Sequence, residues 1–238
     1  MRRFSAFVLT AAVIAFAGCK PQHPSVVKVE PDFVPGDIQT ILVLPVISSV
    51  TEGEDPHRES ETIPNRVLWD HISELQEYTF QSPDTYRMKV YAAKLSESID
   101  DYNDKWVTEH VVDENLLLAL SSLNVDMILI PHIYLWAKDE ADYRETGSAS
   151  ATQVGMTISL VDPESGRIMW EATDENYRES VRTEGDRIQA SSGGINRRIS
   201  GTSFSGKDIY AAPPFEDVVV MVVSALVDAI PEKIAPFK

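Results

Sequence analysis

Cysteine is almost absent from this sequence, since Cys19 is the only one among 238 residues. The chain after it therefore has neither a disulfide framework nor a thiol nucleophile. Basic residues are also scarce: 21 Lys and Arg stand against 37 Asp and Glu, and the formal net charge is −16. Because affinity for nucleic acid depends on neutralising phosphates with Lys and Arg, we expect no nucleic-acid partner.

The motifs that mark metal centres and common active sites are missing as well. None of the five histidines lies in an HExxH motif, which would place two ligands on one helix face. The acidic residues at 97–104 lack the glycine and final glutamate of an EF-hand. Residues 201–206 (GTSFSG) lack the G-x-S-x-G spacing of a serine nucleophile turn. We predict that the protein is not an enzyme and holds no metal or cofactor, and that His132 is a packed or hydrogen-bonded residue.

The first 19 residues have the pattern of an export signal. Two arginines precede an uncharged apolar run at 4–17, which is too short for a spanning helix of about 20 residues but typical of a signal peptide. The run ends in FAGC at 16–19, which resembles the lipobox of bacterial lipoproteins, with phenylalanine where leucine is usual. We predict a signal peptide at 1–18 and lipidation of Cys19. The alternatives are an ordinary signal peptide cleaved elsewhere and a buried helix.

Lipidation would fix the cellular address. Stable anchoring needs more than one acyl chain, at about 0.8 kcal/mol per buried methylene, so we expect palmitate and other acyl groups at Cys19. By resemblance to well-studied lipoproteins, Lys20 favours the outer membrane, with the domain facing the periplasm. Processing would leave 19 basic residues against 37 acidic ones, a net charge of −18. Residues 19–36, with four prolines, predict a tether of at most about 55 Å, and residues 37–238 are enough for one domain.

Hydrophobic patterning predicts the strands of that domain. The apolar run at 38–47 and the run at 125–137 predict buried strands, and Pro131 indicates an edge or a bulge in the second. Clean alternation at 153–161 and a return strand at 167–177 predict a hairpin, closed by a turn at 162–166. A short strand is expected at 78–81.

Helical spacing predicts the remaining elements. A first helix is expected after Pro64, and a longer one entered through a cap at 82–84, where apolar residues recur every three or four positions over 88–106. Asp113 is expected to cap a short leucine-rich helix. Residues 215–230 contain β-branched residues that favour a strand by propensity, but the polar residues gather on one side, so we predict a helix. With a mobile loop at 182–212, the order is β-α-β-α-α-β-β-β-α, which predicts an α/β fold with a mixed sheet and helices packed on it.

Three further stretches carry a family resemblance, together with the opening strand ILVLP at 41–45. They are VDMIL at 125–129, GSASATQV at 147–154 and LVDPESGRIMWE at 160–171. The sequence resembles a family of uncharacterised bacterial envelope lipoproteins, akin to the curli-secretion lipoprotein, the lipoprotein activator of a penicillin-binding protein and the N-terminal domain of the Tol-Pal periplasmic protein. The resemblance implies a protein that assembles with envelope partners. A pore like that of the secretion member is not expected, because the one hairpin carries acidic residues that would face lipid.

Two segments are candidate contacts for a partner protein. The loop at 182–212 is locally basic in an acidic domain, and its cations either contact an anionic partner or fold back on the protein's own acids. They are Arg182, Arg187, Arg197, Arg198 and Lys207. Val220 and Val227 lie at the margins of the apolar face of the last helix, where they either contact a partner or belong to the core.

The leading functional hypothesis is a lipid-anchored, non-enzymatic adaptor or accessory factor for an envelope protein complex. The second is a structural homo-oligomer, such as a ring or an accessory component of transport or secretion. The third is a cell-wall hydrolase, which would need two carboxylates or a Ser–His pair converging in a cleft, an arrangement that spacing alone does not reveal.

Overall fold

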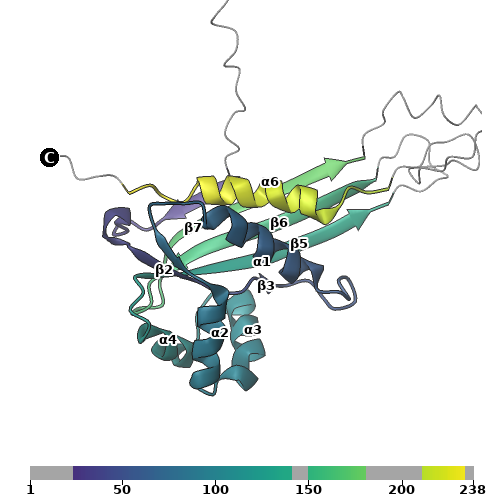
Figure 1. The fold of residues 1–238 in the computed structure, drawn as a ribbon. Helices are drawn as coiled ribbons and strands as arrows, with labels where there is room; N and C mark the ends of the chain where they lie inside the picture. Colours follow the sequence, from purple (N-terminus) through teal and green to yellow (C-terminus); the bar gives the residue numbers. More distant parts are fainter. Residues whose placement is uncertain (1–23, 141–149, 181–210, 234–238) are drawn as a thin grey trace, which may run out of the picture.

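The computed structural model describes residues 24–140, 150–180 and 211–233. Within them, seven strands form one open mixed sheet in the order β1-β7-β6-β5-β2-β4, with β3 beside β5, and helices lie on both faces (Figure 1). The strands are β1 (Val26–Val29), β2 (Thr40–Val43), β3 (Ile47–Ser48), β4 (Thr79–Gln81), β5 (Met127–Asp139), β6 (Ala151–Val161) and β7 (Ile168–Glu179). The helices are α1 (Glu59–Ile72), α2 (Pro83–Ala92), α3 (Ile99–Glu109), α4 (Glu114–Ser121) and α6 (Phe215–Asp228), with short 3₁₀ helices at Pro35–Asp37 and Ser96–Ser98. The predicted α/β fold with a mixed sheet is confirmed.

β6 and β7 form the long antiparallel hairpin that the alternating sequence predicts. Their pairing runs from Ala151 opposite Glu179 to the turn. There the N–H of Asp162 donates to the carbonyl of Arg167 at 2.9 Å. Gly166 adopts φ +70°, which glycine does without the steric penalty of a Cβ atom.

Pro131 lies inside the sheet, where its missing N–H would normally break a ladder. β5 pairs with β6 on one side, and on the other with β2 up to Leu129 and with β3 from His132. The carbonyls of Leu129 and Ile133 both accept hydrogen bonds from the side of β2 and β3. Because backbone groups point to alternate sides along a strand, the nitrogen of Pro131 faces the same side, at the gap between β2 and β3. The predicted edge is therefore wrong: the neighbouring strand is split instead, and the bulge falls at Tyr134.

α1 and α6 cover one face of the sheet and form the larger hydrophobic core with it (Figure 1). Val218 and Val222 of α6 are fully buried, and the Phe215 ring stacks on Trp136 at a centroid distance of 3.9 Å. The predicted helix is confirmed, because packing of an apolar face contributes more to a helix in a protein than intrinsic propensity does.

α2, α3 and α4 cover part of the opposite face, over β2 and the first half of β5, and form a second core. The single helix predicted at 88–106 is wrong: α2 ends at Ala92, Lys94 takes φ +59°, and the chain turns before α3. The prediction placed the apolar residues of 88–106 on one face of a continuous helix. Because the chain breaks after α2, Tyr91 of that set is exposed, whereas Tyr86 and Val90 are buried.

α1 begins at Glu59, earlier than the start predicted after Pro64. The Asp55 carboxylate, only 7% exposed, accepts the backbone N–H groups of Glu59 at 3.0 Å and Ser60 at 2.7 Å. These bonds satisfy donors that have no partner within the helix. The first turn was missed because its residues are polar and carry no apolar repeat.

The segment before the domain also departs from expectation. Residues 26–29 form β1, which pairs antiparallel with β7, and Phe33 is buried in the larger core. The tether predicted over residues 19–36 is therefore wrong for residues 24–36, which lie against the sheet. The exposed valines of β1 show no one-sided burial pattern, so periodicity could not reveal the strand.

Candidate functional site

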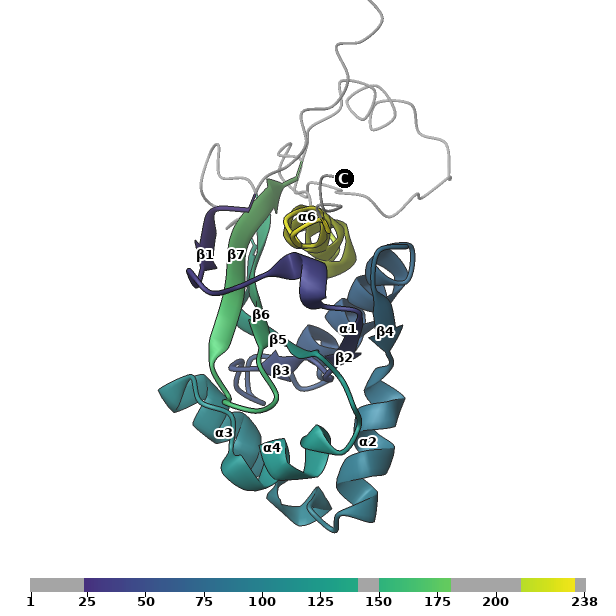
Figure 2. The ribbon, with the colours of Figure 1, turned by 90° about the vertical axis from the view of Figure 1, so that its left-hand side faces the viewer.

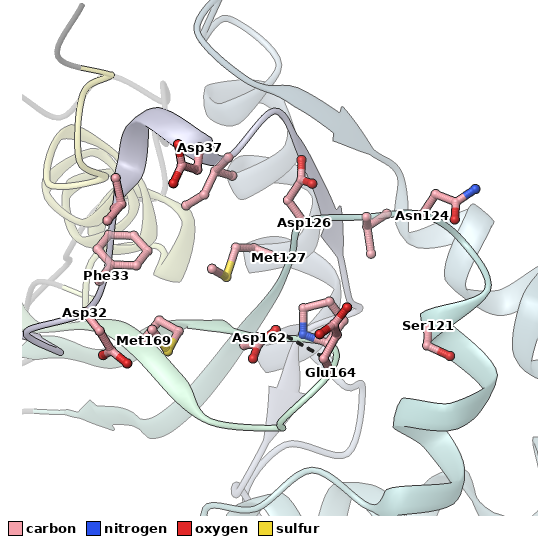
Figure 3. A pocket seen from close by; sticks show the side chains of 14 residues that line it. Asp32, Phe33, Asp37, Ser121, Asn124, Asp126, Met127, Asp162, Glu164 and Met169 are labelled. Carbon is pink, nitrogen blue, oxygen red and sulfur yellow. Dashed lines mark hydrogen bonds between the residues drawn. The ribbon is translucent and has the colours of Figure 1, made fainter. Parts of the chain in front are cut away.

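A cavity of about 450 Å³ opens at one end of the sheet (Figure 3). Its wall comes from the segment 32–38, the start of β5, the end of α4 with the following turn, and the β6–β7 turn. Segments far apart in the sequence meet here because β2 and β5 are parallel neighbours, so that both begin at this end.

The floor of the cavity is apolar. Phe33, Ile38, Val125 and Met169 contribute buried side chains, and Met127 is partly buried beside them. Figure 3 shows Phe33 and the two methionines between the acidic side chains. A concave apolar surface with a few polar groups at its margin is typical of binding sites.

The polar lining of the cavity is acidic. Its 14 lining residues include five carboxylates and no Lys, Arg or His. The carboxylates belong to Asp32, Asp37, Asp126, Asp162 and Glu164. Because like charges repel, this surface disfavours anionic ligands such as phosphates and favours cations.

Three of these carboxylates also hold the wall together. Asp126 Oδ2 accepts the N–H groups of Gln39 and Thr40, both at 2.8 Å, which joins the start of β2 to that of β5. Asp162 accepts the N–H groups of Glu164 and Ser165 in the hairpin turn.

The third, Asp32, bonds Arg167 at 3.0 Å. This hydrogen bond lowers the pKa of Asp32 below its ordinary value, so Asp32 is a poor proton donor at neutral pH.

The other two carboxylates are available to a ligand. The exposed side chains of Asp37 and Glu164 make no ion pair or side-chain hydrogen bond within the described part of the chain. No group of three or more His, Cys, Asp or Glu residues in that part could hold a metal ion. The geometry is suited to binding an amine or guanidinium group over an apolar floor.

A Ser–His pair does occur, at a different place. Ser49 Oγ lies 2.5 Å from His132 Nε2. Burial, and to a lesser extent His110, lower the pKa of His132 to about 4, so its imidazole is neutral at pH 7. The N–H of Ser49 donates to the carbonyl of Ile133 and is not available to stabilise an oxyanion. Neither residue lines the acidic cavity, and the pair joins the end of β3 to β5.

The most connected buried carboxylate is Glu171 of β7, on the sheet face opposite α6. It bonds Lys28 Nζ at 2.8 Å, His110 Nε2 at 3.2 Å and Ser159 Oγ at 3.2 Å. Burial raises the pKa of Glu171, but the hydrogen bond from Lys28 and the positive charges of Lys28 and His110 lower it by more. The pKa of Glu171 is therefore lowered on balance. The cluster links β1, β6, β7 and the end of α3.

The predicted contact residues do not meet at the cavity. Cys19 and the five cations of the 182–212 loop (Arg182, Arg187, Arg197, Arg198 and Lys207) lie outside the described residues. Val220 is 40% exposed, whereas Val227 is 4% exposed and belongs to the larger core. A partner can therefore reach Val220 but not Val227.

Sequence reasoning missed the acidic cavity altogether. Its carboxylates are spread from Asp32 to Glu164, and four of them lie in turns or directly before a strand, where acidic residues are common. The available signal was the position of Asp126 and of Asp162–Glu164 at strand ends. Only the pairing of parallel β2 and β5 brings these ends together.

No protein-family model and no curated protein matches the sequence. Solved structures do match. The lipoprotein GNA1162 from Neisseria meningitidis is 16% identical, with a TM-score of 0.43 over 64% of this chain and 94% of that chain. A PelC dodecamer from Paraburkholderia phytofirmans is 12% identical, with a TM-score of 0.39 over 85% and 95%. The LpoB C-terminal domain from Salmonella enterica is 11% identical, with a TM-score of 0.36 over 61% and 86%.

A lipoprotein is thus among the solved structures that this chain matches, as the sequence resemblance predicts. The likeness assigns no partner and no activity to this chain.

Proposed function

We propose that this protein is a lipid-anchored, non-enzymatic adaptor of the cell envelope, which binds a basic segment of a partner protein in its acidic cavity. The observation that carries the proposal is the cavity itself: its lining has five carboxylates and no Lys, Arg or His around an apolar floor, and only Asp32 is paired with a cation, Arg167. Lipidation of Cys19 would supply the anchor. In the described ranges, no helix combines the length and apolarity needed to span a membrane.

The docking of β1 limits how far the domain can reach from a lipid anchor. Only six peptide steps separate Cys19 from Ser25, and Ser25 is bonded to Asp174 through its N–H and its hydroxyl group. Six steps span at most about 20 Å. The adaptor would therefore act close to the membrane surface, on a partner that is itself near the membrane.

The chemistry of the cavity selects the kind of partner segment. Lys and Arg combine a cationic head with an apolar stem, which matches carboxylates above a floor of Phe33, Met127 and Met169. A free amine or a metal ion would pair with the carboxylates but would make no contact with the apolar floor. A segment with alternating basic and apolar residues fits both.

The anchor is tested by a Cys19→Ser variant of the full chain. We expect wild-type protein in the membrane fraction with an acylated N-terminal peptide by mass spectrometry, and the variant in the soluble fraction. A Lys20→Ser variant is the matched control, which should remain in the membrane. Membrane association of Cys19→Ser would refute the anchor without bearing on the cavity.

The cavity is tested by a photo-crosslinking amino acid at Ser121, an exposed lining residue, with Tyr91 of α2, also exposed, as the control position. We expect an adduct from Ser121 alone, at a Lys- or Arg-containing segment of an envelope protein. The double variant Asp37→Lys/Glu164→Lys should abolish the adduct, and Glu97→Lys/Asp104→Lys, with the same change in net charge, should retain it. Adducts that persist after charge reversal in the cavity would refute the proposal.

A further inference from the structure

The segment that follows β1 carries the chain across one end of the sheet to β2. β1 lies at the edge beside β7, and β2 lies beyond β6 and β5, so residues 30–38, the crossing segment, pass the ends of these three strands (Figure 2). The crossing segment supplies five residues of the acidic cavity, which are Asp32, Phe33, Val34, Asp37 and Ile38. One continuous stretch of chain therefore leads from the predicted anchor through β1 into the cavity wall.

β1 and the cavity wall are joined without slack. The N–H of Glu30 donates to the carbonyl of Met169 at 2.9 Å, and Met169 also lines the cavity. A proline follows Glu30, and its ring fixes φ. The guanidinium group of Arg167 then bonds both carboxylate oxygens of Asp32 and one of Glu30. Phe33 comes directly after Asp32, so its position on the floor depends on the docking of β1.

The docking of β1 on β7 is itself weak. The three valines of β1 are 49%, 45% and 56% exposed, so docking buries little apolar surface. The ion pair of Lys28 with Glu171 leaves the lysine side chain 73% exposed, and ion pairs in water contribute little stability. Asp174, which accepts two bonds from Ser25, keeps one buried oxygen without a partner in the described chain. Elements with few buried apolar contacts open locally before the core does.

We propose that β1 and the crossing segment dock and open as one unit, so that occupancy of the cavity and the reach of the domain from its anchor control each other. A cation bound between Asp37 and Glu164 meets both walls only when the crossing segment is docked. Such a ligand shifts the equilibrium toward the docked state by the ratio of its affinities for the two states. The role of the ligand and of the anchor rests on the proposed function, whereas the unit rests on the described residues alone.

The two states differ in how far the domain can lie from a lipid anchor. With β1 docked, six peptide steps link Cys19 to Ser25, and with the unit open, nineteen steps link Cys19 to Ile38. Fully extended, these stretches span at most about 20 Å and about 60 Å. A partner bound in the cavity is then held near the membrane, and loss of that partner lets the domain move away from it.

The unit is tested without a ligand, by two proline variants of the full chain in detergent. Since the Glu30 N–H bonds to β7 and backbone groups alternate sides along a strand, the Lys28 N–H also faces β7 and the Val27 N–H points outward. Lys28→Pro therefore removes a ladder bond together with the ion pair to Glu171. Val27→Pro, on the same strand, removes neither and is the matched control.

The measurement is amide hydrogen exchange by mass spectrometry. We expect Lys28→Pro to accelerate exchange of residues 33–38 by about tenfold, Val27→Pro to leave it unchanged, and neither variant to affect β6. Unchanged exchange of residues 33–38 in Lys28→Pro overturns the proposal, because the wall would then be independent of β1. Equal acceleration across β6 also overturns it, because the whole domain would then open and not a local unit.

The link to the cavity is tested with the peptide acetyl-Lys-Phe-Lys-Phe-Lys-amide, whose binding is measured by calorimetry. At about 100 times its Kd, a ligand that binds the docked state alone slows opening about 100-fold. We expect slower exchange at residues 26–30, none of which lines the cavity, and no effect in Asp37→Lys/Glu164→Lys. Binding that leaves residues 26–30 unchanged overturns the coupling. A peptide that does not bind refutes the proposed function, while Lys28→Pro still decides whether the unit exists.

Discussion

The ring of Tyr134 lies against the backbone of Gly155 on the neighbouring strand. A Cβ atom built at position 155 would approach Cε2 and Cζ of Tyr134 to 2.6 Å. Tyr134 occupies the bulge of β5, so the extra residue of the bulge directs this ring across β6. A side chain at position 155 would therefore require this ring to move.

Gly155→Ala should therefore destabilise the domain, because the ring or the backbone must move to admit a methyl group. Overpacking of this kind costs roughly 1–3 kcal/mol, measured by urea unfolding. Gly36→Ala is the control, since no heavy atom lies within 4 Å of a Cβ there, and it should be close to neutral. In a Tyr134→Ala background the cost of Gly155→Ala should largely vanish; an unchanged cost would contradict the contact.

Removing the acceptor at the start of α1 should destabilise the domain. Asp55→Ala leaves the N–H groups of Glu59 and Ser60 without their acceptors, at a cost of about 1–2 kcal/mol, measured by thermal unfolding. Asp55→Asn keeps one acceptor oxygen but sets its NH2 group against the other backbone N–H, so it should lose an intermediate amount of stability. An Asp55→Asn variant as stable as the unaltered protein would contradict the pair of bonds.

Two carboxylates of β7 should affect stability in opposite directions with pH. Burial raises the pKa of Asp174, and its Oδ2 atom is buried without a partner in the described chain. A raised folded-state pKa means that its favourable contribution is present at low pH and is lost as pH rises through that pKa. Asp174→Asn should therefore raise the melting temperature at pH 7 by roughly 2–4 °C, and the gain should disappear in acid.

Glu171→Gln is the counterpart on the same strand. The pKa of Glu171 is lowered on balance by Lys28 and the neighbouring donors, so its contribution is present at neutral pH and is lost as pH falls through the folded-state value. The substitution should lower the melting temperature at pH 7 and have little effect in acid. The same sign of effect for both variants at pH 7 would contradict the assignment.

The two valines predicted as contacts, Val220 and Val227, should differ in their effects on stability. Val227→Ala removes buried methyl groups and should cost roughly 1–3 kcal/mol of unfolding free energy. Val220→Ala, at a side chain that is 40% exposed, should cost less than about 0.5 kcal/mol. If Val220 contacts a partner, its substitution will weaken binding while stability is kept, as measured by co-purification.

Much of the fold was predictable in segments where the apolar residues recur at the spacing of a single helix or strand with one buried face. The β6–β7 hairpin was clear because Val154, Met156 and Ile158 alternate with polar residues and Gly166 closes the turn. α6 was predictable because its polar residues share one side. The break between α2 and α3 was not, since apolar spacing continues through a turn whose geometry depends on the left-handed Lys94.

The sequence by itself determined the acidic character, the apolar leader ending at Cys19, and the helix and strand types of its strongly periodic segments. The tertiary structure alone decided that residues 26–29 form an edge strand, that Pro131 faces a gap inside the sheet, and that distant carboxylates share one cavity. The physical reason is the same in each case: these features depend on which strands lie side by side. Strand pairing joins residues that are far apart in the chain, so local spacing does not encode it.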